Sequence, residues 1–215
     1  MADHASAALA EQFDDMPQQL EASTLGMWTF LATEILFFGV LFAVYTVTRA
    51  VHADAFAAGS RLTDITLASI NTALLLTSSL TMALAVHAAQ RGAQRALLRW
   101  LGLTIFLGLA FLAVKGGEYY VDFTEHLVPT INFDFRGPQA DAVELFFYLY
   151  FFITGVHALH VIIGIGVIAW ITVLAARRRF SPAYYTPVDV TGLYWHLVDI
   201  IWLFVYPCLY LIARS

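Results

Sequence analysis

The stretch AVELFFYLYFFITGVHALHVIIGIGVIAWITVLA, residues 142–175, decides the fold class of this chain. A membrane-spanning α-helix needs about 20 consecutive, mostly apolar residues, because it crosses about 30 Å of hydrocarbon at about 1.5 Å per residue. The stretch is longer than one crossing requires. We therefore expect a transmembrane helix that tilts or that places its first turns outside the hydrocarbon.

Four further apolar stretches predict four more membrane helices, at residues 25–48, 65–88, 97–121 and 192–213. The fold class that follows is all-α, a bundle of five transmembrane helices. The composition agrees, since 60% of the 215 residues are hydrophobic and 13% are charged, against about 45–50% and about 25% in soluble domains. A net charge of −5 with Lys115 as the single lysine argues against binding to nucleic acid, which needs clustered cations.

The first 24 residues differ from the rest, because they carry acids and no lysine or arginine. A cleaved secretory signal opens with positive charge, so none is expected here, and Pro17 argues against one continuous helix through the segment. We divide the chain into an acidic N-terminal tail, residues 1–24, and one five-helix transmembrane domain, residues 25–215.

Arginines indicate the orientation, since short loops rich in Lys and Arg favour the cytoplasm. On the side of the N-terminus, two short loops hold Arg91, Arg95, Arg99, Arg177, Arg178 and Arg179. The opposite side holds Arg49, Arg61, Arg136 and Arg214. We predict a cytoplasmic N-terminus and a periplasmic C-terminus. The long loop at residues 122–141 mixes acids with Phe133 and Phe135, which predicts a loop resting on the bundle or on a partner.

Seven ionisable side chains fall inside the predicted spans, where such groups are rare and are functional candidates by default. They are Glu34, Lys115, Glu118, His157, His160, His196 and Asp199. Glu34 lies about 14 Å below the start of its span at about 1.5 Å per residue. Because desolvation disfavours the charged carboxylate, we expect Glu34 to be neutral or to share a proton. A carboxyl group that merely bonds to a neighbouring helix is the competing interpretation.

The other six residues form pairs with a spacing of three, which places each pair on one helix face. For Lys115 and Glu118 the spacing predicts a local ion pair, with the alternative that Lys115 extends to the membrane surface. Gly116 and Gly117 between them allow another helix or lipid to approach, and Gly155, Gly164 and Gly166 mark the fourth span as closely packed. His157 precedes His160 on that span, and His196 precedes Asp199 on the fifth.

We predict that Glu34, His160, His196 and Asp199 lie at similar depth and form one hydrogen-bonded polar group. Together with His157 they are the candidate lipid-contacting or proton-exchanging cluster. Paired histidines also suit zinc, iron or haem, but the Glu-x-x-His pattern of di-iron bundles and the ligand spacings of structural zinc do not occur. We therefore expect no metal, no cofactor and no catalytic residue in this chain.

Five segments, read in order, resemble subunit III of the haem-copper terminal oxidases in its short, five-helix form. They are GMWTFLATEILFFGVLFAVY (26–45), NTALLLTSSLTMALA (71–85), KGGEYY (115–120), TGVHALHVIIG (154–164) and YWHLVDIIWLFVYPCLYL (194–211). The longer form of the family has seven spans and a cleft that holds lipids. The chain is similar to the five-span form, which does not include the two helices that make one wall of that cleft.

The resemblance implies an accessory, cofactor-free subunit in a bacterial cytoplasmic membrane, with haem and copper in the partner subunits. Subunit I would be its main contact, alongside subunit II and phospholipids, with cytochrome c as donor to the complex. Glu34 matches the family's carbodiimide-reactive glutamate. Subunit III of a quinol oxidase or of a nitric oxide reductase relative remains an alternative. A stand-alone transporter or proton channel is another, although the repeats and broken helices typical of transporters are not evident.

Overall fold

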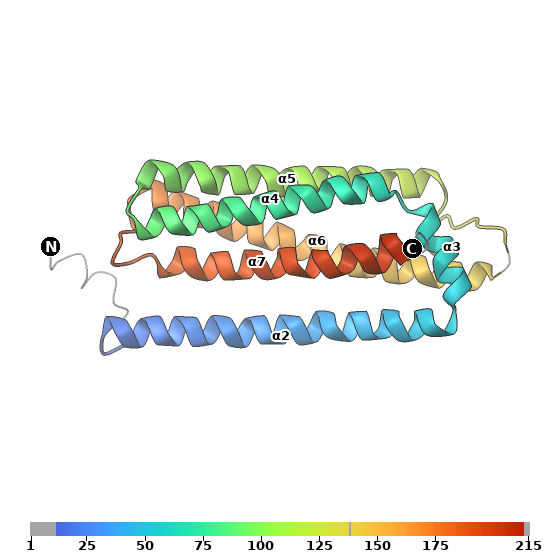
Figure 1. The fold of residues 1–215 in the computed structure, drawn as a ribbon, viewed down its shortest axis with the longest axis horizontal. Coiled ribbons are helices and arrows are strands. Elements are labelled where there is room, and N and C mark those ends of the chain that lie inside the picture. The colour runs from blue at the N-terminus through green and yellow to red at the C-terminus, as the bar shows by residue number, and fades with distance from the viewer. Residues whose placement is uncertain (1–11, 138, 213–215) are drawn as a thin grey trace.

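The computed structural model describes residues 12–137 and 139–212 and consists mainly of long, roughly aligned helices (Figure 1). Five helices are long and apolar enough to cross a membrane. They are α2 (Met16–Val51), α4 (Ile65–Gln90), α5 (Gln94–Thr124), α6 (Ala140–Ala176) and α7 (Thr186–Tyr206), which continues into the π-helix η1 (Pro207–Leu211). The predicted all-α bundle of five transmembrane helices is confirmed. Residues 1–11 of the predicted tail lie outside the described residues, as do Pro138 and residues 213–215.

The first span begins earlier than hydropathy indicates, because α2 starts at Met16. The side chain of Asp15 accepts a hydrogen bond from the backbone N–H of Gln18 at 2.8 Å, which caps the helix. Pro17 lies in the first turn, where its missing N–H costs no intrahelical bond. Residues 16–24 of the predicted tail are thus helical and belong to the same helix as the first span.

A short helix that was not predicted, α3 (Ala53–Leu62), joins α2 to α4 and packs against α6. The ring of Phe56 lies edge-on to that of Phe146, with 5.5 Å between centroids. Gly59 lies so close to the same ring that a Cβ would come within 2.4 Å of it. The helix is too short to cross a membrane, so a search for apolar stretches of spanning length cannot find it.

Helices α4, α5, α6 and α7 form a four-helix bundle, in which α5 and α7 each contact both α4 and α6. Helix α2 lies outside this bundle and packs mainly on α7 (Figure 1). In an apolar 18-residue stretch of α2, 17% is buried inside the chain, against 56% in the corresponding stretch of the last span. Most of the surface of α2 is therefore available to lipid or to another subunit.

Trp195 of α7 occupies the centre of the bundle between α5 and α6. A Cβ on Gly108 or on Gly164 would come within 2.9 Å of its indole ring, so both backbones touch it. The expectation of close packing is confirmed for Gly164. It is wrong for Gly166. Within residues 12–137 and 139–212, a Cβ on Gly116, Gly117 or Gly166 would meet no atom closer than 4 Å.

The long loop between α5 and α6 rests on the bundle, which is the first of the two predicted alternatives. The rings of Phe133 and Phe147 lie 6.1 Å apart. Near the loop surface the Arg136 guanidinium binds Asp134 at 2.9 Å and lowers the pKa of that carboxyl group. Asp122, predicted to start the loop, instead lies in the last turns of α5 and is buried.

Candidate functional site

Lys115 and Glu118 form an ion pair inside the bundle, one turn apart on α5. The Nζ atom of Lys115 lies 3.0 Å from Oε2 of Glu118, and the two side chains are 3% and 2% exposed. The predicted ion pair is therefore present, and the alternative in which Lys115 reaches the membrane surface is wrong. A buried pair is stable only when further hydrogen bonds satisfy its remaining donors and acceptors.

Two tyrosines that the sequence did not single out supply those bonds. Lys115 Nζ donates to the hydroxyl of Tyr150 on α6 at 3.0 Å and to that of Tyr210 on η1 at 2.7 Å. Tyr210 in turn donates to Oε1 of Glu118 at 2.7 Å. Oη of Tyr150 lies 2.7 Å from the same Oε1 and 3.1 Å from Oδ2 of Asp122. We call these five residues the Lys115 network.

Aromatic rings surround the ammonium group of the network. Nζ lies 4.5 Å from the ring centroid of Tyr150 and 4.9 Å from that of Tyr119, with Tyr210 and Trp202 at 5.4 and 5.8 Å. The negative faces of aromatic rings attract a cation within about 6 Å, most strongly when it is shielded from water. These rings and the carboxylate of Glu118 therefore offset part of the cost of burying the ammonium group.

Glu34 and His160 form the second polar contact, across the boundary between α2 and α6. His160 Nε2 lies 3.0 Å from Oε2 of Glu34, and the side chains are 15% and 17% exposed. On the other side of the imidazole, Nδ1 lies 2.8 Å from the backbone oxygen of Val156. A carbonyl oxygen can only accept, so Nδ1 carries a hydrogen. The contact to Glu34 then needs a further proton, which sits between the imidazole and the carboxyl group.

The predicted group of four does not form as one unit. Nδ1 of His196 lies 2.7 Å from the hydroxyl of Ser79 on α4, and the carboxyl group of Asp199 interacts with the same hydroxyl. No hydrogen bond in residues 12–137 and 139–212 joins either residue to Glu34 or His160. Helix α7 turns His196 toward α4, whereas Glu34 lies on α2. The sequence indicates how deep a residue lies along its helix, but not how the helix is rotated about its axis.

His157 is separate from His160, although the two are only three positions apart on α6. Its imidazole ring is fully buried, with its centroid 5.6 Å from that of the Phe111 ring and 5.1 Å from that of the Trp202 ring. Neither ring nitrogen has a hydrogen-bond partner among the described residues. Three residues advance a helix by about 300°, so the second side chain is displaced around the helix by about 60°. This displacement directs His157 into the core and His160 toward α2. Within the described ranges, no three His, Cys, Asp or Glu side chains are grouped so that they could hold a metal ion.

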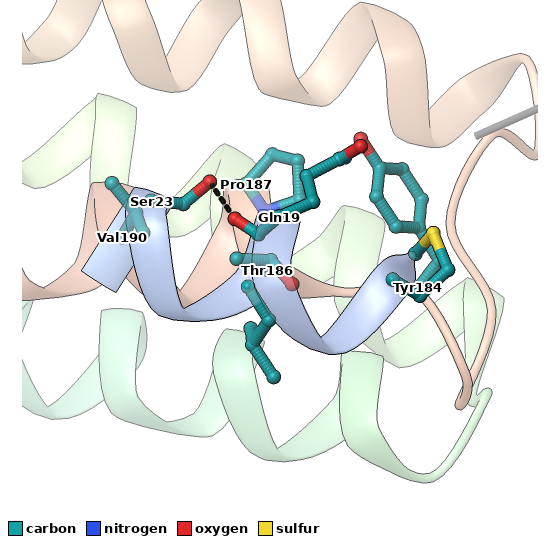
Figure 2. Close-up of a pocket in the computed structure, with 8 residues that line it drawn as sticks. Gln19, Ser23, Tyr184, Thr186, Pro187 and Val190 are labelled. Atoms are coloured by element: carbon teal, nitrogen blue, oxygen red, sulfur yellow. Dashed lines mark hydrogen bonds between the residues drawn. The ribbon is translucent and has the colours of Figure 1, made fainter. Parts of the chain in front are cut away.

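Figure 2 shows a cavity of about 140 Å³ between the first turns of α2 and the beginning of α7. The hydroxyl of Ser23 donates to the backbone oxygen of Gln19 at 2.8 Å beside it. Its lining consists of Met16, Gln19, Leu20, Ser23, Tyr184, Thr186, Pro187 and Val190. None of the seven predicted site residues lines this cavity.

Comparisons with known proteins identify the family of this chain. The family described as cytochrome c oxidase subunit III matches residues 18–214. Cytochrome c oxidase subunit 3 of Alkalihalophilus pseudofirmus is 34% identical over 196 residues, covering 88% of this chain and 86% of the relative. Quinol oxidase subunit 3 of Bacillus subtilis is 31% identical over 189 residues, with coverage of 88% and 86%. Cytochrome bo(3) ubiquinol oxidase subunit 3 of Pseudomonas aeruginosa is 31% identical over 194 residues, with coverage of 89% and 85%. The chain belongs to the cytochrome c oxidase subunit III family and is a membrane subunit of a haem-copper oxidase of the cytochrome c or quinol type.

Proposed function

We propose that this chain is the accessory, cofactor-free subunit III of a cytochrome c oxidase, which packs on subunit I and binds phospholipid beside Glu34. One observation carries the proposal. The Glu34–His160 contact is a partly exposed polar contact between two spans whose exposed large side chains are mainly apolar, among them Leu36, Leu159 and Ile163. In a membrane such a surface contacts acyl chains or another subunit's helices.

The proton shared between Glu34 and His160 fits both roles that the sequence suggested for Glu34. The two groups lie 3.0 Å apart, and both side chains are partly accessible from the membrane side. A partly exposed polar pair at this depth also gains from cover by a neighbouring molecule, because unpaired polar groups are costly in hydrocarbon.

We expect Glu34→Ala to preserve assembly while lowering phospholipid retention or shortening the active lifetime during turnover. Partly exposed pairs contribute no more than about 1 kcal/mol, so the fold should survive the loss of this one. The measurements are lipid phosphorus per purified complex and the rate of inactivation during turnover. Glu21→Ala is the matched control, since Glu21 lies on the same helix and is exposed. Equal lipid content and equal inactivation rates for the two variants would contradict the proposal.

We further propose that the N-terminus is cytoplasmic and the C-terminal end periplasmic. Arg95, Arg99 and Arg178 line a shallow depression at the beginning of α5. Arg95 and Arg99 lie in the first turns of α5 and Arg178 lies in the loop after α6, at the end of the bundle where α2 begins (Figure 1). Anionic lipid headgroups of the cytoplasmic leaflet attract such cations, which supports this orientation in the bacterial cytoplasmic membrane.

The electron donor is the finer part of the proposal, because relatives of both types match at similar identity. The 34% identical relative from Alkalihalophilus pseudofirmus favours cytochrome c. We expect the purified complex to contain subunits I and II, to hold copper in subunit II and to oxidise reduced cytochrome c. A complex without copper in subunit II that oxidises only quinol would assign the chain to the quinol type. Family membership disfavours a stand-alone transporter, a proton channel or a nitric oxide reductase relative.

A further inference from the structure

The Lys115 network contains two carboxyl groups and one cation. An ammonium group has three N–H donors, and Lys115 directs them to Glu118 Oε2 at 3.0 Å, to Tyr150 at 3.0 Å and to Tyr210 at 2.7 Å. All three donors are used, and none is directed to Asp122. Lys115 therefore balances the charge of Glu118 and leaves the second carboxyl group without a counter-charge.

The hydroxyl group of Tyr150 lies between the two carboxyl groups. Its Oη is 2.7 Å from Glu118 Oε1 and 3.1 Å from Asp122 Oδ2. A hydroxyl group donates one hydrogen and accepts through two lone pairs, so Tyr150 cannot donate to both carboxylates. Glu118 is closer and receives this hydrogen. The contact with Asp122 then requires a hydrogen that Asp122 itself carries.

We propose that Asp122 is protonated at neutral pH and that the Lys115 network is a binding site for one exchangeable proton. With a hydrogen on Oδ2, Asp122 donates to Tyr150, Tyr150 donates to Glu118, and the network is electrically neutral. With Asp122 ionised, two carboxylates compete for one hydroxyl hydrogen, and one buried negative charge stays uncompensated. Burial of an unpaired charge is costly, and Asp122 is only 4% exposed.

The position of Asp122 gives its proton a route to water. The residue lies within the last turn of α5, which ends at Thr124. The charged groups that interact with its carboxyl group are Glu118, Lys115 and Glu125, all on the same helix. The hydroxyl of Tyr150 on α6 makes a hydrogen bond to it. Asp122 also interacts electrostatically with the hydroxyl group of Tyr119. Glu125 is exposed at the helix end. The proton therefore exchanges at the end of the bundle opposite to the start of α2 (Figure 1).

Infrared difference spectroscopy of the full-length chain in the oxidase complex tests this proposal. At neutral pH, the spectrum of the wild type minus that of Asp122→Asn should contain the carbonyl stretch of one protonated carboxylic acid. The band should shift to lower frequency in D₂O, since the proton exchanges. The difference between the wild type and Asp141→Asn should contain carboxylate bands only, because Asp141 is exposed. Carboxylate bands in the Asp122 difference spectrum would overturn the proposal.

A second variant keeps the test decisive if Asp122→Asn fails to assemble. Tyr150→Phe removes the acceptor of the Asp122 proton, so the acid band should move to higher frequency. An unchanged band in this variant would show that the protonated acid is a different residue, and the proposal would fail. This outcome is independent of the electron donor and of lipid binding, so neither part of the proposed function depends on it.

Discussion

Replacing Lys115 with methionine will lower the free energy of unfolding by about 3–5 kcal/mol, the loss measured when one partner of a buried ion pair is removed. Methionine fills a similar volume, so little of this loss comes from a cavity. The loss arises because Glu118 remains buried with its charge uncompensated. Unfolding of the purified chain in mixed micelles, followed by helical circular dichroism, measures the change.

The double variant Lys115→Met, Glu118→Gln should recover most of that stability, since it removes both charges. Tyr150 and Tyr210 can still bond to the glutamine side chain, whose oxygen accepts as the carboxylate does. Glu125→Gln is the control, because Glu125 is an exposed acid on the same helix end, and surface substitutions usually stay within about 0.5 kcal/mol. If Lys115→Met costs less than about 1 kcal/mol, the ammonium group is not the charge that balances Glu118.

The sequence alone predicts the five spans because hydrocarbon thickness imposes a length that apolar stretches reveal directly. It misses α3, which is too short to span hydrocarbon, and the first turns of α2, which are too polar to be recognised as part of a span. The Lys115–Glu118 pair is predictable for another reason. Its two members lie on one helix, so their spacing alone places them together.

Contacts between helices are the part that the sequence does not determine. Asp122 follows Glu118 by four residues and shares its face of α5, a spacing that extends the pattern and could have been noticed. Tyr150 and Tyr210 come from α6 and η1, and only the packing brings their hydroxyl groups to Lys115. The same limit explains the error for His196 and Asp199. Their depth in the membrane was inferred, whereas their direction depends on how α7 is rotated against α4.

Gly164→Ala should destabilise the bundle by about 1–3 kcal/mol, the usual cost of inserting a methyl group into a closely packed core. The new Cβ would lie 2.9 Å from two atoms of the Trp195 ring and 3.2 Å from the ring of Tyr194. Trp195 has no room to retreat, because the backbone at Gly108 contacts its ring, where a Cβ would also lie 2.9 Å away. Its indole N–H is also held by the hydroxyl of Ser78 at 3.1 Å.

Gly166→Ala is the matched control on the same helix. A Cβ at Gly166 meets no atom within 4 Å, so this change should be neutral or stabilising by up to about 1 kcal/mol through helix propensity. The two variants, unfolded in the same micelles, should therefore differ in sign or by more than about 1 kcal/mol. Combining Gly164→Ala with Trp195→Phe should cost less than the sum of the separate changes, because the smaller ring leaves space for the new methyl group. Equal losses for Gly164→Ala and Gly166→Ala, or strict additivity with Trp195→Phe, would mean that the tryptophan does not set the spacing of α5, α6 and α7.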